Sequence, residues 1–223
     1  MATPNSTPKA KVVVLISGSG SNLQALIDGQ RTGELPIEIC AVISNRPGVL
    51  GLERASKAGI PALLINHIDF DSRETFDQAL VEAIDAHQPD LVVLAGFMRI
   101  LTPGFTHHYL GRMLNIHPSL LPKYQGLHTH QRAIDAGDKE HGVTVHFVTA
   151  ELDGGPAAIQ AKVPVAPGDD ANALAKRVQA QEHVIYPLAV KWFAQGRLTM
   201  DNGKSLLDGE LLPASGYLID TTT

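Results

Sequence analysis

Asn115 and His117 are two residues apart in the stretch LNIHPSLLPKYQGLHTH, and together they could act on a carbonyl group. Pro118 disfavours a helical conformation for the residue before it, so the stretch around His117 is expected to be extended. In a strand, residues two apart project from the same face. An amide beside an imidazole could polarise a carbonyl and stabilise an oxyanion. The alternative is an ordinary strand-end histidine bonded to neighbouring backbone, and a lone histidine does not separate the two.

Asp153, in the segment ELDGGP, is the candidate partner for this imidazole. A carboxylate held by a turn with two glycines could orient an imidazole and keep it charged. Spacing along the chain does not show that the two side chains meet. Their contact is therefore a hypothesis that only the fold can test.

A glycine-rich loop, SGSGSNL, separates the first apolar run from a stretch with helical spacing. Backbone amides at such a helix start favour an anion. Leu23 stands where the dinucleotide fingerprint has its third glycine, no acidic residue follows the second strand, and the P-loop lysine is missing. We therefore expect a monophosphate site rather than one for NAD or ATP. The alternative is a tight strand-to-helix turn with Asn22 as a local cap.

The other reactive side chains form no comparable pattern. His128 and His130 lie in an expected loop without cysteine or HExxH ligands nearby, so no metal site is expected. His107 and His108 are expected on the solvated surface. The sequence has no GxSxG elbow for a serine hydrolase, and Cys40 lies inside an expected strand, where packing is its expected role.

Composition limits the class of protein. The chain has 223 residues, 44% of them hydrophobic, which is enough for one sizeable core. Its net charge is -5, and the sequence shows no basic face of the kind that nucleic-acid binders carry. One cysteine suits a reducing compartment. The polar start is unlike a signal peptide, and no apolar run is long enough to cross a bilayer. We expect a cytoplasmic protein with small-molecule partners and no membrane or nucleic-acid partner. The oligomeric state stays open, with a homodimer as a candidate.

Hydrophobic patterning predicts alternating strands and helices. Strands are expected at 11–17, 37–45, 61–66 and 90–97, with helices after the glycine loop, at 48–59 and at 72–87. Two further strands, 142–149 and 157–165, are expected to form a hairpin around ELDGGP, followed by a helix at 170–194, bent at Pro187. This order predicts a single-domain α/β protein with a doubly wound, mostly parallel sheet. The expected divisions are a flexible N-terminus at 1–10, the main domain at 11–200 and a C-terminal extension at 201–223.

Several motifs together resemble the glycinamide ribonucleotide formyltransferases, a folate-dependent family of purine biosynthesis. They are LISGSGSNLQALID, VVLAGFMRIL, LNIHPSLLPKY with GLHTH, GVTVHFVTAELDGGP and VQAQEHVIYP, which span roughly residues 11 to 200. The resemblance implies a Rossmann-like formyltransferase fold. It implies that Asn115, His117 and Asp153 are catalytic. It implies substrate contacts from Gly20, Ser21, Asn22, Gln179 and Glu182, and a folate site formed by Arg73, Met98, Arg99, Ile100, Leu101, Asn115, Thr149, Ala150, Glu151, Leu152 and Asp153.

The implied reaction transfers a formyl group from 10-formyltetrahydrofolate to the amine of 5'-phosphoribosylglycinamide, without a metal. Formyltetrahydrofolate deformylase and methionyl-tRNA formyltransferase are related alternatives, but each is expected to carry a further domain. A nucleotide-binding regulator would explain the glycine loop and would leave the Asn-His pair without a role. Gln125 departs from the family pattern, which commonly has proline there, so the mobility of this loop is an open question.

Overall fold

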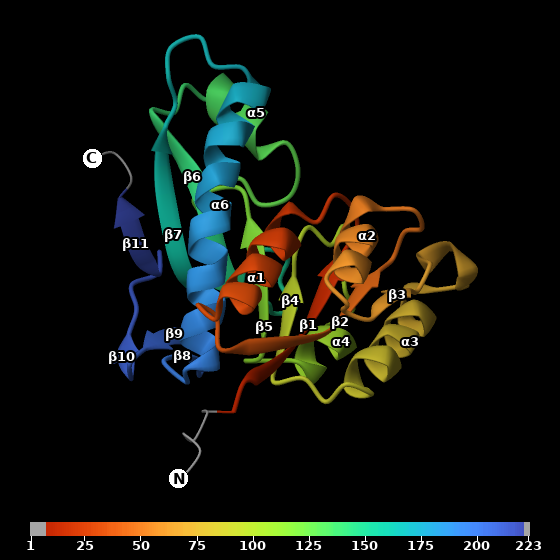
Figure 1. Ribbon diagram of the computed structural model, residues 1–223. Coiled ribbons are helices and arrows are strands. Elements are labelled where there is room, and N and C mark those ends of the chain that lie inside the picture. The colour runs from red at the N-terminus through yellow and green to blue at the C-terminus, as the bar shows by residue number, and fades with distance from the viewer. Residues whose placement is uncertain (1–7, 221–223) are drawn as a thin grey trace.

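The computed structural model describes residues 8–220, in which a central sheet is covered by helices (Figure 1). Eight strands form the sheet in the order β11-β7-β6-β5-β4-β1-β2-β3. All neighbours are parallel except where β6 pairs with β5 and β7. The strands are β1 (Ala10–Ile16), β2 (Ile37–Ser44), β3 (Ala62–Leu64), β4 (Leu91–Leu94), β5 (Met113–His117), β6 (Glu140–Phe147), β7 (Ala157–Pro164) and β11 (Tyr217–Asp220). The expected doubly wound, mostly parallel sheet is confirmed.

Helices cover both faces of the β1–β4 half of the sheet. The helices are α1 (Ser21–Thr32), α2 (Leu50–Lys57), α3 (Arg73–Asp85), α4 (Pro103–His108), α5 (Thr129–Asp135) and α6 (Ala171–Ala194), with a short 3-10 turn η1 (His67–Asp69). Side chains of α1, α2 and α6 share one buried cluster, and those of α3 and α4 share the other. The sequence patterning did not predict α4 or α5, because each is short and carries few apolar residues.

The first strand explains why its sequence is an unbroken apolar run. Val12 and Val14 pack into the α1 side of the core, while Val13 and Leu15 pack into the α3 side. All four side chains are fully buried. A strand covered on both faces needs apolar residues at every position. Since β2 lies on one side of β1 and β4 on the other, the sheet order reverses at β1, and ligands of such folds bind outside the carboxyl ends of the strands at this point.

The β6–β7 half of the sheet is covered differently. The expected hairpin is confirmed, with Val143 opposite Ala161 in an antiparallel ladder. Helix α6 packs on one face of these strands through residues such as Leu174 and Val178. The α3–α4 core cluster contains no residue of β6 or β7. In this part of the described chain, loops therefore take the place of a helix on the opposite face.

The C-terminal segment holds four strands that the patterning did not resolve. A small antiparallel sheet contains β8 (Leu198–Asp201), β9 (Lys204–Leu207) and β10 (Glu210–Leu211), and β11 then pairs with β7 in the main sheet. Residues 1–7 and 221–223, which include most of the expected N-terminal segment, lie outside the described residues. Within residues 8–220 no helix has the length and apolarity needed to span a membrane.

Candidate active site

Strand β5 carries Asn115 and His117 on one face. Leu114 and Ile116 belong to the α6 side of the core, so the residues between and after them take the opposite face. Asn115 is paired with Leu94 of β4 on one side and with His146 of β6 on the other. The extended conformation expected before Pro118 is confirmed. The pair therefore lies in the middle of the sheet rather than in a surface loop.

Both nitrogens of the His117 ring face a partner. Nδ1 is 3.5 Å from Oδ2 of Asp153, and the two side chains are 8% and 9% exposed. Nε2 donates a hydrogen bond to the carbonyl oxygen of Tyr124 at 2.8 Å. The Asp153 partner and the neighbouring-backbone partner, which were alternatives in the sequence, are thus both present.

His146 completes a buried polar group that sequence reasoning missed. Its Nδ1 donates to the carbonyl of Phe147 at 2.9 Å, which leaves Nε2 to accept from the Asn115 amide at 3.2 Å. Burial lowers the pKa of His146, against smaller opposing effects of the Phe147 carbonyl and of Asp153. The neutral ring is an acceptor at Nε2. Strand alternation would have placed His146 on one face of β6, but only the pairing register sets it beside Asn115.

The loop between β6 and β7 folds back to bring Asp153 to His117. Asp153 has a left-handed backbone with φ of 51°. Its Oδ2 accepts the backbone N–H of Gly126 at 2.9 Å. A Cβ added at Gly155 would collide with the carbonyl of Phe147, so only glycine fits there. The ELDGGP motif is thus a turn whose glycines allow the close approach that positions the carboxylate.

Buried hydrogen bonds fix the loop that follows His117. Thr144 donates its hydroxyl to the Ser119 carbonyl at 2.7 Å and accepts the Leu121 N–H at 3.1 Å. Gln160 donates to the Leu121 carbonyl at 2.8 Å. Thr129 donates its hydroxyl to the carbonyl of Pro118 at 2.6 Å. Both ends of the loop are therefore attached to the sheet and to α5, and this determines where the Tyr124 carbonyl lies.

The glycine loop meets α6 at the carboxyl end of β1. Asn22 donates to Oε2 of Glu182 at 2.8 Å, and Gln179 donates to the Ser21 hydroxyl at 3.3 Å. The alternative of Asn22 as a local cap is wrong, because α1 has no side-chain cap and its Ncap residue is Gly20, with φ of 70°. The residues expected to contact the ribonucleotide therefore lie together. Two of them on α6 are hydrogen-bonded to Ser21 and Asn22, and Gly20 is the residue before Ser21.

Two polar groups in this part of the candidate site are buried, the Glu182 carboxyl and the Asn22 side-chain oxygen. Burial raises the pKa of Glu182, although the Asn22 hydrogen bond, His183 and His117 each oppose the shift. The carbonyl oxygen of the Asn22 side chain is buried and has no hydrogen-bond partner among the described residues. Buried polar atoms are rarely left unpaired without a functional reason.

The expected folate residues lie on two loops that flank the catalytic pair. Met98, Ile100 and Leu152 are 56%, 57% and 52% exposed, so the apolar surface of both loops is open to solvent. The Met98 N–H donates to the Ser17 hydroxyl at 2.8 Å, which ties the first loop to β1. Arg99 and Leu101 follow on that loop, and Thr149, Ala150 and Glu151 belong to the second.

Arg73 lies on α3, whose Asp77 accepts the Thr102 N–H at 2.7 Å just after the first loop. It is exposed at the first position of α3, whose N-cap is Ser72, and it forms no ion pair or hydrogen bond among residues 8–220.

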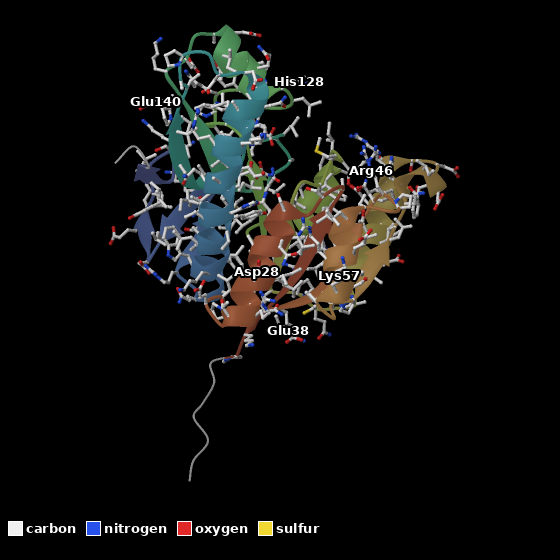
Figure 2. All side chains as sticks on the ribbon, turned by 45° about the horizontal axis from the view of Figure 1, so that its top comes forward. Asp28, Glu38, Arg46, Lys57, His128 and Glu140 are labelled. Atoms are coloured by element: carbon white, nitrogen blue, oxygen red, sulfur yellow. The ribbon has the colours of Figure 1, made fainter. Side chains whose placement is uncertain are left out.

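Residues 8–220 contain no group of three histidine, cysteine or acidic side chains that could hold a metal ion. Figure 2 shows His128 and Arg46 toward one side of the molecule and Glu38 and Lys57 toward the other, so charged groups are spread over the surface.

The fold and this site define a folate-type one-carbon transferase, and the comparison with protein families agrees. Residues 10–190 match the model of the formyl transferase family, so the chain belongs to that family. A relative from Escherichia coli (strain K12), named phosphoribosylglycinamide formyltransferase, is 57% identical over 209 residues, which cover 94% of this chain and 99% of that protein. The resemblance expected from the motifs is confirmed.

One further relative and two solved structures are also similar to this chain. The human trifunctional purine biosynthetic protein adenosine-3 is 46% identical over 197 residues, which are 88% of this chain but 20% of that protein. The phosphoribosylglycinamide formyltransferase of Coxiella burnetii, solved in complex with CHES, superposes with a TM-score of 0.91 at 53% identity, covering 95% of this chain and 99% of that one. Glycinamide ribonucleotide transformylase 1 from Symbiobacterium toebii superposes with a TM-score of 0.87 at 46% identity, covering 89% of this chain and 94% of that one.

Proposed function

We propose that this protein transfers the formyl group of 10-formyltetrahydrofolate to the amine of 5'-phosphoribosylglycinamide in purine biosynthesis. The products are formylglycinamide ribonucleotide and tetrahydrofolate. The observation that carries the proposal is the placement of Asn115, His117 and Asp153 within one buried group, next to a glycine loop joined to α6. The first group suits acyl transfer and the second suits a phosphorylated substrate.

The chemistry follows from the buried group. The substrate amine attacks the formyl carbon and a tetrahedral oxyanion forms. The Asn115 amide has two N–H bonds, and only one of them is taken by His146, so the other is available to the oxyanion. A protonated His117 adds a second, charged donor. Asp153, 3.5 Å away, supports the imidazolium and, through water, takes the proton that the attacking amine loses. The tetrahedral species collapses when the bond from the formyl carbon to the folate nitrogen breaks, and that nitrogen receives a proton by the same water as tetrahydrofolate leaves.

One contact must change for His117 to act as this donor. Its Nε2–H is already used by the Tyr124 carbonyl, and its Nδ1 faces Asp153. A hydrogen bond from Nε2 to the oxyanion therefore has to replace the bond to Tyr124. Because hydrogen bonds hold the loop after Pro118 in place, we assign this exchange to a small reorientation of the His117 ring.

The remaining residues divide between the two substrates. Gly20, Ser21 and Asn22 offer the start of α1 to the phosphate, while Gln179 and Glu182 reach its ribose side from α6. The unpaired Asn22 oxygen can accept a hydrogen bond from the ribonucleotide. The exposed apolar side chains of Met98, Ile100 and Leu152 are assigned to the flat ring system of the folate. Arg73 is assigned to the negatively charged tail of the folate.

Incubation of the purified protein with the formyl donor, with and without phosphoribosylglycinamide, tests the proposal. We expect formylated ribonucleotide and loss of the donor only when both substrates are present. Donor hydrolysis without the amine would indicate a deformylase. Formylation of methionyl-tRNA would indicate the tRNA enzyme, and binding of the ribonucleotide without turnover would indicate a regulator.

A cytoplasmic location, a homodimer and the absence of nucleic-acid and membrane partners stay predictions from the sequence. The division into a main domain at 11–200 and an extension at 201–223 is also a proposal. Because β11 of the extension pairs with β7, we expect removal of residues 201–223 to destabilise the main sheet as well. Truncation after residue 200 followed by thermal unfolding measures this effect.

A further inference from the structure

Gln125 connects the two loops that hold His117 and Asp153. Its side-chain nitrogen lies 3.3 Å from the Leu152 carbonyl oxygen and 3.4 Å from that of Asp153, as donor to both. The next residue, Gly126, donates its backbone N–H to Oδ2 of Asp153. The same oxygen faces His117. Residues 125 and 126 therefore hold Asp153 at its backbone and at its carboxylate.

Packing gives the Asp153 loop little support from behind. A cavity of about 510 Å³ separates this loop from the C-terminal strands, and its walls include Gln125, Asp153, Lys204 and Leu211. A surface that borders a cavity lacks the contacts that would hold it in place. The position of this loop therefore depends on its hydrogen bonds more than that of a packed loop would.

The backbone of Asp153 also needs to be held. A left-handed φ of 51° is unfavourable for a residue with a side chain, and it persists only where the surroundings enforce it. Gln125 is suited to this task because its own backbone is anchored. The Arg132 guanidinium donates to the Gln125 carbonyl at 2.7 Å and stacks over the Tyr124 ring, 5.2 Å from its centroid.

We propose that Gln125 is a positioning residue, whose side-chain amide keeps Asp153 in the orientation that supports His117. The proposal rests on the proposed function for its catalytic consequence, but not for its structural content. It also accounts for the departure from proline at this position. Proline has no side-chain donor, so the contact with the Leu152 and Asp153 carbonyls exists only because glutamine is present.

Three variants separate the donor from the size of the side chain. Gln125→Met keeps a long side chain without a donor, and Gln125→Lys restores a donor at similar length. Gln131→Ala is the control, because Gln131 is an exposed glutamine on α5 that donates only to Asp135, one turn away. The measurements are kcat and KM for both substrates, thermal unfolding, and backbone hydrogen exchange of the segment 148–156.

We expect Gln125→Met to lower kcat about tenfold, since a small displacement of a reacting group is enough for such a loss. Both KM values should change less than about twofold, and exchange in 148–156 should become about tenfold faster, as for a loop freed of its restraint. Gln125→Lys should recover most of both effects, and Gln131→Ala should match the wild type. Unchanged exchange in Gln125→Met, or a lysine variant no better than the methionine variant, would overturn the proposal.

Failure of the proposed function gives a different result. A wild-type protein without formyl transfer would refute that function, while the exchange measurement would still decide whether Gln125 restrains the Asp153 loop. Faster exchange in 148–156 with normal kcat in an active enzyme would contradict the positioning role alone. If Gln125→Met lowers the unfolding temperature as a whole and exchange rises in every segment, Gln125 has a general structural role and the proposal is wrong.

Discussion

The amide nitrogen of Asn115 lies 3.2 Å from Nε2 of His146, directly across the β5–β6 pairing. Because the other His146 nitrogen donates to the Phe147 carbonyl, the ring can only accept from Asn115 while it is neutral. This arrangement fixes which end of the Asn115 amide points toward the substrate side. Under the proposed function, His146 orients the Asn115 amide that serves as oxyanion donor, without being that donor itself.

Replacing His146 with phenylalanine should therefore lower kcat about tenfold and leave KM within about twofold. Phenylalanine keeps the ring volume and removes the acceptor, so the amide of Asn115 loses its orientation. Steady-state kinetics with both substrates gives the two parameters. A parallel rise of KM for the folate at constant kcat would mean that the ring shapes the binding surface instead.

Replacement of His117 by alanine should reduce turnover by a factor on the order of a hundred to a thousand, as for loss of one oxyanion donor. Substrate affinity should change little, because the imidazole acts mainly in the transition state. Single-turnover kinetics with saturating substrates measures the chemical step directly. Normal turnover with a raised KM would reassign His117 to binding.

Two neighbouring glycines provide a matched test of the phosphate loop. A Cβ at Gly20 would lie 2.8 Å from the Gly51 Cα, and φ there is 70°, so Gly20→Ala should destabilise the fold by about 1–3 kcal/mol. Gly18 has open space around it, so Gly18→Val should keep the stability and obstruct the anion.

Calorimetry separates these two effects. Gly18→Val should weaken binding of phosphoribosylglycinamide about tenfold or more and leave its dephosphorylated counterpart nearly unchanged, since backbone approach to the phosphate is what the side chain blocks. Equal weakening of both compounds would argue against a phosphate site at this loop. Thermal unfolding of both variants provides the stability comparison.

Stability should fall as the pH drops below about 6.5, because His130, His141 and His146 have lowered pKa values in the folded protein and resist protonation. Burial and, to a smaller extent, the neighbouring His130 lower the pKa of His141 to about 4, while Asp138 and the Pro118 carbonyl oppose the shift. Burial also lowers the pKa of His130. The unfolded chain then binds more protons than the folded chain between pH 6.5 and about 4, so unfolding is favoured as pH falls through this window.

Denaturant unfolding at several pH values measures this dependence, and His141→Asn is the informative variant. His130 Nδ1 and His141 Nε2 are 3.2 Å apart, so one ring donates to the other only while the pair is not doubly charged. The variant should lose part of the slope of unfolding free energy between pH 6.5 and 4. An identical slope in the variant would show that other groups cause the acid sensitivity.

Local sequence signals predicted much of this molecule because they depend on near neighbours. The apolar run of β1 is continuous because both faces are buried, and the extended conformation of His117 follows from Pro118. The helix expected from residue 72 has Ser72 as its N-cap, whose hydroxyl accepts the Thr75 N–H at 3.2 Å. The C-terminal strands were missed, since strands of two to four residues give too few alternations to detect.

The candidate site residues were predicted from the sequence, but the contacts among them were decided by the tertiary structure. Asn115 and His117 share a face because strand residues alternate, and this needs only the local chain. Asp153 reaches His117 across 36 positions of sequence, and Asn22 reaches Glu182 across 160, through loop paths and helix packing. His146 lies beside Asn115 because of the strand register, and Gln125 contacts the Asp153 loop because of the path of its own loop. Both depend on the whole fold, so the neighbouring sequence does not predict them.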